Sequence, residues 1–379
     1  MNAELVRLGA RRFIALSEVW TDSFFDNFTT MSSSLSRSSK LRNLFMSSYR
    51  GSTKSALRQR LYHPKTATVE PLIHNFYEPV TGTWQYIVED EHTKQSMIID
   101  PVLDYDSATN KISTHSARSI LSLVEQRSLN VQRLLETHVH ADHLTASHYL
   151  KMKLSASQST SPAVCIGADI TEIQRDLAPR YKITQSELDE SFDETYSEGD
   201  EFDVGSLHVS VIELAGHTPN HVGYVIGSNV FVGDSIFNPD LGSARVDFPK
   251  GSASALWSSM QFLLSLPGHF KLYTGHDYPP ADREHAGEKG QPRPYATVDE
   301  HKQSNKHAKS GTVENEFVRW RTNRDHKLKA PKLLHQSLQV NLLGGRFPTA
   351  NGQRNGLLTV PVELPEDFEN TVHGSKSSL

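Results

Sequence analysis

Cysteine is almost absent from this chain of 379 residues, because Cys165 is the only one. A disulfide scaffold and a cysteine-based zinc finger are therefore excluded. Long apolar runs are missing as well. None approaches the ~20 residues that a membrane-spanning helix needs, so we expect no membrane insertion. Histidine, in contrast, occurs 19 times. If the protein holds a metal, imidazole and carboxylate groups must be its ligands.

Acidic residues are missing between Asn27 and Val69, a stretch rich in serine and arginine. Residues 1–66 hold eleven Lys/Arg and four Asp/Glu, so this segment carries +7 whereas the whole chain carries −5. Such a composition is typical of a mitochondrial presequence. We interpret 1–66 as a disordered basic segment that directs the protein to the mitochondrial matrix, with Met31 as an alternative start. If the segment has no targeting role, we expect a cytoplasmic protein.

Beyond residue 66 the chain carries −12 and offers no basic groove, so we expect no nucleic-acid partner. After Pro71 strand-like and helix-like segments alternate. The expected strands are 84–89, 96–100, 131–137, 163–166, 207–214, 223–226, 229–233 and 271–274. The expected helices are 115–130, 144–153, 169–177, 252–266 and 314–328, with a long polar stretch at 279–312. Hairpins mixed with helices indicate an α/β protein, a sandwich of two mixed sheets flanked by helices.

Three histidines and an aspartate are concentrated in segment 137–143, which reads THVHADH. Their positions are His138, His140, Asp142 and His143, between an expected strand and an expected helix. Alternate residues of an extended segment point the same way, so His138 and His140 can converge. Burying so many polar rings is costly unless hydrogen bonds or a cation satisfy them. The segment therefore predicts a metal site.

Three further polar residues each follow an expected strand and stand beside a glycine that lets the backbone turn. They are His217 in GHTP, Asp234 in GDS and His276 in GHD, at successive spacings of 79, 17 and 42 residues from His138. A single Gly-His or Gly-Asp pair is usually only a turn. As an ordered set after HxHxDH, the three indicate one site assembled from several strand ends.

This ordered set resembles the metallo-β-lactamase superfamily, whose fold is an αββα sandwich with metals at the edge between the sheets. Within it, the segments ETHVHADHLTAS, GHTPNHVGYVI, FVGDSIFNPDLGSARVDFPKG and TGHDY are most similar to the persulfide dioxygenase (sulfur dioxygenase, ethylmalonic encephalopathy protein) family. The resemblance runs from about residue 73 to about 346 and includes the block LQVN at 338–341. We therefore assign 71–346 to a metallo-β-lactamase-like catalytic domain and 347–379 to a loop and flexible tail.

The resemblance implies one Fe(II) per chain, held by His138, His217 and Asp234. It also implies a reaction in which glutathione persulfide, O2 and water give sulfite and glutathione. Two imidazoles and one carboxylate on one face of an octahedron leave positions open for reactants. By the same resemblance Arg245 and Tyr278 contact the substrate, with an ion pair between Arg245 and Asp247 as the alternative for the arginine.

The remaining motif residues leave a second reading open. In the resemblance, His140, Asp142, His143 and His276 either surround the iron or hold a second metal. Two metals, such as Zn(II), would suit a glyoxalase II-like thioester hydrolase. The LGSARVDFP block, and a C-terminal region without that family's basic helical domain, favour the dioxygenase. A homodimer stays an open alternative for the oligomeric state.

The sequence also allows us to predict the environment of three other residues. We expect Asp100 to fix loops beneath the site rather than to bind metal. His221, which follows GHTP where small residues are more usual in the family, is expected to face solvent. Cys165 is expected to be a small buried residue of an apolar strand.

Overall fold

The computed structural model describes residues 69–285, 287–349 and 357–361. Segment 1–66, for which the sequence predicts a presequence, lies outside these residues, as does most of the predicted tail 347–379. None of the described helices is long and apolar enough to cross a membrane.

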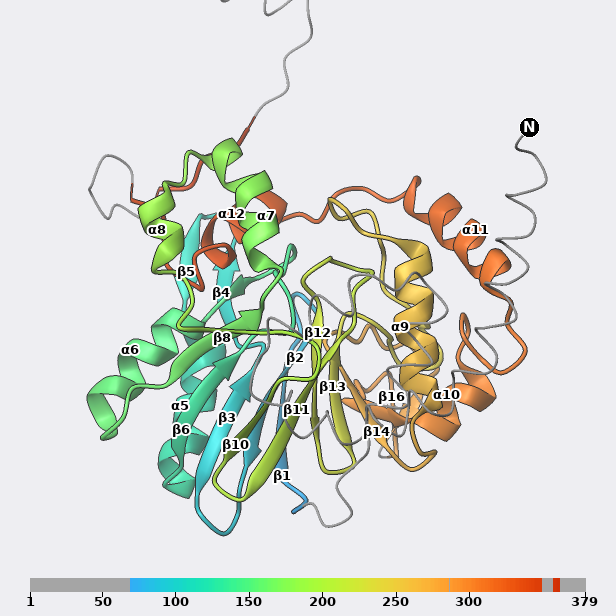
Figure 1. The fold of residues 1–379 in the computed structure, drawn as a ribbon, viewed down its shortest axis with the longest axis horizontal. Helices are drawn as coiled ribbons and strands as arrows, with labels where there is room; N and C mark the ends of the chain where they lie inside the picture. The colour runs from blue at the N-terminus through green and yellow to red at the C-terminus, as the bar shows by residue number, and fades with distance from the viewer. Residues whose placement is uncertain (1–68, 286, 350–356, 362–379) are drawn as a thin grey trace, which may run out of the picture. The chain divides into compact units, whose positions relative to one another are not determined.

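Two six-stranded sheets form the centre of the described part (Figure 1). The first has the order β1(Leu72–Glu78), β2(Thr83–Glu89), β3(Gln95–Ile99), β6(Asn130–Leu135), β8(Ala163–Gly167), β9(Glu194–Tyr196). The second has the order β10(Glu201–Val204), β11(Leu207–Glu213), β12(Val222–Ile226), β13(Asn229–Gly233), β14(Lys271–Thr274), β17(Tyr295–Thr297). Both are mixed, because β3, β6, β8 and β9 run parallel in the first sheet and β13 and β14 in the second.

Helices lie outside the two sheets. In Figure 1, α5 and α6 lie on the side of the first sheet, and α9, α10 and α11 on the side of the second. The helices are α5(His115–Arg127), α6(Ser147–Ser157), α7(Ile170–Leu177), η1(Ala178–Tyr181), α8(Gln185–Asp189), α9(Ala253–Ser265), α10(Val298–Ser304), α11(Glu314–Asp325) and α12(Leu334–Asn341). Two small sheets complete the fold, one of β4(Val102–Asp106), β5(Lys111–Ser113) and β7(Leu144–Thr145), and one of β15(Glu284–His285) and β16(Glu288–Lys289).

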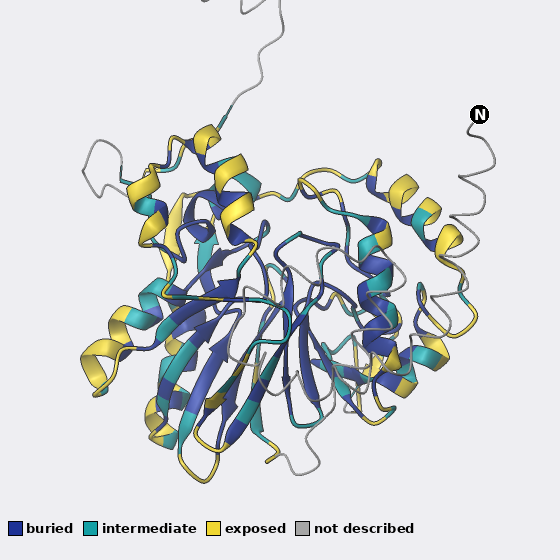
Figure 2. Cartoon of the chain, viewed as in Figure 1, coloured by how far each residue is buried: buried dark blue, intermediate teal, exposed yellow. Residues whose placement is uncertain are grey.

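Alternation along the strands explains the layers. Successive side chains of a strand point to opposite faces. Tyr86 belongs to the core between the sheets, whereas the next residue, Ile87, packs with α5 and α6. In the second sheet Phe231 faces the first sheet, and Val230 and Val232 pack beneath α9. Both sheets are thus buried on both faces (Figure 2), and the predicted αββα sandwich is confirmed.

The predicted elements are largely present, with differences where the sequence pattern is weak. The hairpins β2–β3 and β12–β13 form as expected. The helix predicted over 144–153 begins only at Ser147, because Leu144 and Thr145 pair with β4. The polar stretch 279–312 contains β17 and α10, which begins with a capping box between Thr297 and Glu300. Several described elements were not predicted: β1, β4, β5, β9, β10, η1, α8 and α12.

Candidate metal centre

The motif residues meet because the strands that precede them end at one edge of the sandwich. His138, His140, Asp142 and His143 follow β6, whereas His217 follows β11. Asp234 follows β13 and His276 follows β14. Since β11, β13 and β14 run in the same direction, their carboxyl ends lie at the same edge of the second sheet.

Glycine lets these strand ends approach closely. A Cβ atom at Gly275 would lie 2.6 Å from Asp234 Oδ1, so only glycine leaves room for the carboxylate there. Gly233 has φ +46°, and a Cβ at this position would lie 2.8 Å from the Nε2 atom of His221. The Gly-Asp and Gly-His pairs of the sequence are therefore required by packing at the site itself.

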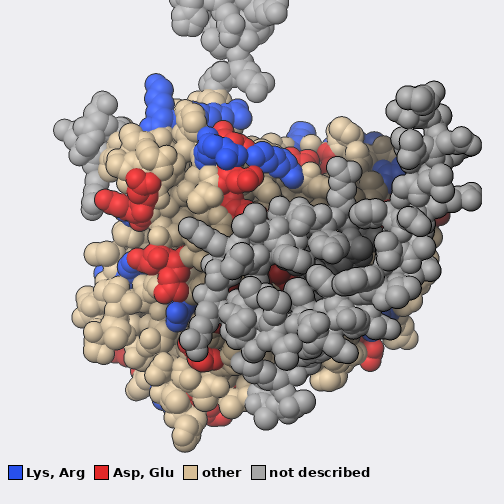
Figure 3. Space-filling view, in the orientation of Figure 1, with Lys and Arg blue, Asp and Glu red and all other residues tan. Residues whose placement is uncertain are grey.

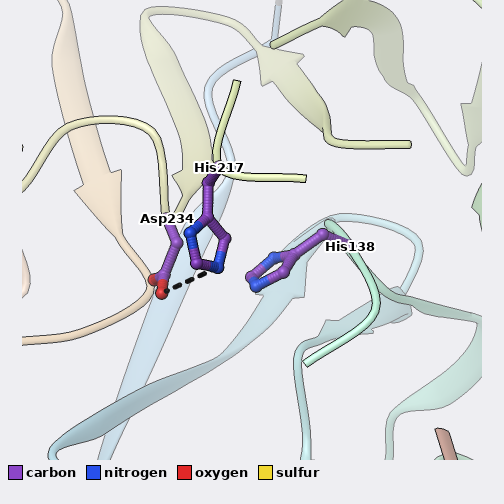
Figure 4. Close-up of side chains that lie close together, drawn as sticks. All are labelled: His138, His217 and Asp234. Atoms are coloured by element: carbon purple, nitrogen blue, oxygen red, sulfur yellow. Dashed lines mark ion pairs between the residues drawn. The ribbon is translucent and has the colours of Figure 1, made fainter. Parts of the chain in front are cut away.

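His138, His217 and Asp234 form one group whose ligand atoms all lie within 4.8 Å of one another. The Nε2 atom of His217 is 3.8 Å from Asp234 Oδ2. Figure 4 shows the rings of His138 and His217 pointing toward each other, with the Asp234 carboxylate beside them. All three side chains are buried.

In both His217 and His138 the Nδ1 atom makes a hydrogen bond, and Nε2 faces the other ligand atoms of the group. His217 Nδ1 lies 2.7 Å from the carbonyl oxygen of Arg245 and must donate to it, which leaves Nε2 with a lone pair. His138 Nδ1 is 2.9 Å from Thr137 Oγ1. Burial, together with the nearby rings of His140 and His221, holds the pKa of His138 well below its usual value. His138 is thus presented as a neutral imidazole, the form that metal ligation requires.

A second group consists of His140, Asp142 and His143. His276 connects the two groups, because its Nδ1 is 2.6 Å from Asp234 Oδ1 and its Nε2 is 2.7 Å from Asp142 Oδ2. Burial lowers the pKa of His276, but the Asp234 and Asp142 carboxylates outweigh burial and raise it well above its usual value.

Four buried ring nitrogens at the centre have no hydrogen-bond partner among the described residues: Nε2 of His138, Nδ1 of His140, Nε2 of His143 and Nδ1 of His221. Buried polar atoms are normally paired, and each unpaired one needs an explanation. A cation that accepts a lone pair from ring nitrogens of this kind supplies a missing partner, and its binding to His140 would release the proton that this imidazole otherwise carries. The donor set of imidazole and carboxylate fits Fe(II) or Zn(II).

The residues of the metal centre lie within the part of the chain that matches a known protein family. The sequence model of the Metallo-beta-lactamase superfamily matches residues 79–276, more than half of the chain. The chain belongs to the metallo-β-lactamase superfamily. Its αββα sandwich and its cluster of histidine and aspartate at the sheet edge indicate a metal-binding enzyme of this superfamily.

Known members of the superfamily differ in the activity that their names state. The "Beta-lactamase hydrolase-like protein" of Xylella fastidiosa is 45% identical over 293 residues, which are 76% of this chain but only 65% of that protein. "Glyoxylase B2" of Dictyostelium discoideum is 39% identical, over 77% of this chain and 96% of the relative. The human "Persulfide dioxygenase ETHE1, mitochondrial" is 28% identical over 210 residues, 55% of this chain and 68% of the relative.

Among solved structures, ETHE1 from Myxococcus xanthus has 27% sequence identity and a TM-score of 0.56, over 72% of this chain and 99% of that one. Together with the human relative, it supports the resemblance to the persulfide dioxygenase family that the motifs indicate. The hydrolase-like names belong to relatives of higher identity.

Beneath the centre, Asp100 fixes the loop as expected. Its carboxylate accepts hydrogen bonds from Thr137 N at 2.7 Å and Thr137 Oγ1 at 2.8 Å, and lies 3.1 Å from His140 Nε2. Glu136 Oε2 is 3.3 Å from the same ring nitrogen. Burial lowers the pKa of His140, but these two carboxylates outweigh burial and raise it to about 10. Cys165 is buried in β8, as predicted.

The prediction for His221 was wrong. Its side chain is fully buried, and its ring stacks on His138 with ring centres 4.7 Å apart. His221 Nε2 accepts a hydrogen bond from the backbone N–H of Asp234 at 3.0 Å. The strand ends converge on this residue, so tertiary packing, and not the local sequence, determines its burial. Its spacing of four residues from His217 was the only feature of the local sequence that could have indicated a place at the centre.

Arg245 and Tyr278, the two predicted substrate contacts, behave differently. The guanidinium of Arg245 donates from Nε to Asp247 Oδ1 at 2.5 Å and from Nη2 to Asp247 Oδ2, which is the alternative arrangement foreseen for it. Tyr278 is 52% exposed, and its ring is nearly parallel to that of His276 at 5.9 Å. Tyr278 therefore stands at the mouth of the centre.

Two C-terminal helices also contact the centre, which the sequence did not reveal. Asn341 of α12 donates to the carbonyl oxygens of His140 and His143. On α11 the buried pair of Arg321 and Asp325 holds the segment that backs His217: Asp325 Oδ2 accepts from Val246 N at 2.8 Å, and Arg321 Nη1 donates to Ser243 O at 3.3 Å. Both helices lie beyond residues 79–276.

Proposed function

We propose that this protein is an iron-dependent persulfide dioxygenase that oxidises glutathione persulfide to sulfite and glutathione. The group His138, His217 and Asp234 carries the proposal, because two imidazoles and one carboxylate with open positions are typical of non-haem Fe(II) oxygenases. The similarity to the two ETHE1 proteins supports it. Iron(II), when bound, supplies the redox chemistry with dioxygen.

The reaction balances with one persulfide, one O2 and one water. The S–S bond breaks, and the outer sulfur is oxidised to sulfite while O2 is reduced. Glutathione leaves as its thiolate and takes up a proton. The imidazoles of the centre are shielded from solvent, since His138, His140, His143 and His276 are each about 1% exposed. Tyr278 lines the cavity that reaches the centre and would border a bound persulfide.

The test is oxygen uptake by the purified, iron-loaded protein with glutathione persulfide. We expect uptake with release of sulfite in equal amount, and none from the variant Asp234→Asn. An iron-loaded protein that takes up no oxygen, yet releases glutathione from S-lactoylglutathione, would contradict the proposal.

The second candidate is a glyoxalase II-like hydrolase with two metals, such as Zn(II). The group of His140, Asp142 and His143, joined to Asp234 through His276, favours it, as does the similarity to "Glyoxylase B2". Metal analysis separates the candidates, because the hydrolase needs two metals per chain and the dioxygenase one.

We also propose that residues 1–66 direct the protein to the mitochondrial matrix. Their charge of +7 and the lack of acids between Asn27 and Val69 support this. A fusion of 1–66 to a fluorescent protein is expected to enter mitochondria, and a cytoplasmic signal would contradict the proposal.

A further inference from the structure

Two of the three residues on the buried face of α11 are charged. Phe317, Arg321 and Asp325 are the buried residues of this helix, and their spacing of four places them on one side. Figure 3 shows other charged side chains on the surface, where water solvates them, whereas Arg321 and Asp325 are each only 5% exposed. A buried ion pair is costly to desolvate and often adds no net stability, so this pair calls for another role.

The carboxylate of Asp325 also contacts a peptide group of the metal centre. It accepts from Nη2 of Arg321 and, at 3.1 Å, from Nε of the same residue. Its Oδ2 atom accepts in addition from Val246 N at 2.8 Å. The carbonyl oxygen of that same peptide group belongs to Arg245, and it accepts from His217 Nδ1 at 2.7 Å. One peptide group therefore connects a buried carboxylate to an imidazole of the centre, and we call this series of two hydrogen bonds the relay.

The two hydrogen bonds of the relay strengthen each other. This peptide group is trans, so its N–H and C=O point in opposite directions and share one resonance system. An anion that accepts from the N–H moves electron density onto the carbonyl oxygen, which becomes a better acceptor for Nδ1–H of His217. An imidazole that donates more strongly from one nitrogen is a more basic ligand through the other. The charge of Asp325 therefore favours metal binding by Nε2 of His217.

The segment that carries this peptide group is also held at a second point. Arg321 Nη1 donates to Ser243 O at 3.3 Å, and Ser243 N donates to His307 Nδ1 at 3.0 Å. Burial and the nearby guanidinium of Arg321 lower the pKa of His307 to about 4, so its neutral ring can accept this hydrogen bond. The peptide group is thus fixed in position between α11 and the centre.

We propose that Asp325 is a positioning residue of the metal centre. It acts through the peptide group between Arg245 and Val246, strengthens the hydrogen bond that orients His217, and so raises the affinity of the centre for its metal. Arg321 fixes the carboxylate of Asp325 in the required position. The relay requires only that His217 binds a metal, so it goes beyond the proposed function and holds for either candidate reaction.

The test measures binding of Co(II) to the full chain by competition with a chelator. Asp325→Asn keeps an oxygen that can accept from Val246 N but removes the negative charge, and we expect it to weaken Co(II) binding roughly three- to tenfold. Asp325→Ala removes the acceptor as well and should weaken binding roughly ten- to a hundredfold. A second readout is the NMR signal of the His217 Nδ1 proton, which bound Co(II) shifts far from the other signals. This proton should exchange with water faster in both variants than in wild type.

Phe317→Leu is the matched control, because Phe317 shares the buried face of α11 but not the relay. It packs on Trp257 of α9, with ring centres 5.3 Å apart. We expect this variant to have a lower Tm, with the Co(II) affinity and the Nδ1 proton exchange of wild type.

Two results would overturn the relay. One is an Asp325→Asn variant that binds Co(II) as tightly as wild type does. The other is an equal loss of affinity in Phe317→Leu, since the packing of α11 would then account for the effect. Failure of oxygen uptake by the wild type, in contrast, would overturn only the proposed reaction.

Discussion

The side-chain amide of Asn341 donates to the carbonyl oxygen of His140 at 2.9 Å, across 201 residues of sequence. The same nitrogen donates to His143 O at 2.8 Å, and the amide oxygen accepts from Thr145 N at 2.8 Å. One buried side chain of α12 therefore fixes three points of the loop that carries the HxHxDH motif.

Replacing Asn341 should loosen that loop. We expect Asn341→Ala to lower the free energy of unfolding by about 2–3 kcal/mol, because buried backbone groups lose their partners. It should also weaken metal affinity, measured by competition with a chelator. Asn323→Ala, an exposed position on α11, is the control and should change neither quantity. Unchanged metal affinity in Asn341→Ala would show that the loop holds its shape without α12.

Asp234 and Asp142 should differ in their importance for the iron. Asp234→Asn should empty the site, since Asp234 shares a group with His138 and His217. Asp142→Asn should leave much of the iron in place, because Asp142 lies in the other group. Elemental analysis of both variants after identical iron loading checks this. Equal loss of iron would contradict a mononuclear site.

His221 should stabilise the centre. Its Nε2 atom accepts a hydrogen bond from Asp234 N, so we expect no metal to bind there. His221→Phe keeps an aromatic ring against His138 but leaves the N–H of Asp234 unpaired, at a cost of about 1–3 kcal/mol. A fall in Tm is expected. His92→Phe, at an exposed turn, is the control. An unchanged Tm for His221→Phe would mean that the Asp234 N–H finds another acceptor.

Glu89 should make stability depend on pH in acid. Its carboxylate is buried and accepts from Arg127 Nε at 2.5 Å and Lys94 Nζ at 2.8 Å. Burial raises the pKa of Glu89, but these cations and His74 outweigh burial and lower it to about 2. In the unfolded chain a glutamate has a pKa near ~4.3. The charged form therefore stabilises the fold above about pH 4, and this contribution is lost as the pH falls toward 2.

The corresponding variant is Glu89→Gln. We expect it to be less stable than wild type by about 1–3 kcal/mol at neutral pH and to approach wild type between pH 4 and 2. Urea unfolding of both proteins with metal removed measures the difference. A gap that stays constant over this pH range would show that Glu89 does not titrate as described.

Most of this fold, and the candidate residues of the metal centre, could be predicted from the local sequence. The HxHxDH segment, and strand ends followed by glycine and histidine or aspartate, are local features that identified seven candidate ligands. The choice of His138, His217 and Asp234 among them came from the family resemblance, and the structure brings these three together. The two hairpins were predictable for the same reason, since turn residues separate adjacent strands.

Contacts between distant segments were not predictable in this way. The burial of His221 depends on the convergence of several strand ends, and the residues just before it are polar. Asn341 lies in a short block without a metal-binding pattern, and its role depends on contacts some 200 residues away. The pairing of Arg245 with Asp247 is local, and it was foreseen as an alternative because the two residues are only two apart.

The position of Asn341 also affects the order of events during synthesis. Chains emerge from the ribosome from the N-terminus onward. The HxHxDH loop and all strands of both sheets are made before α12, which ends at Asn341. A nascent chain can therefore assemble its sandwich while this loop still lacks its clamp. The loop is complete only after α12 has been made, so we expect stable metal loading to follow the synthesis of this helix.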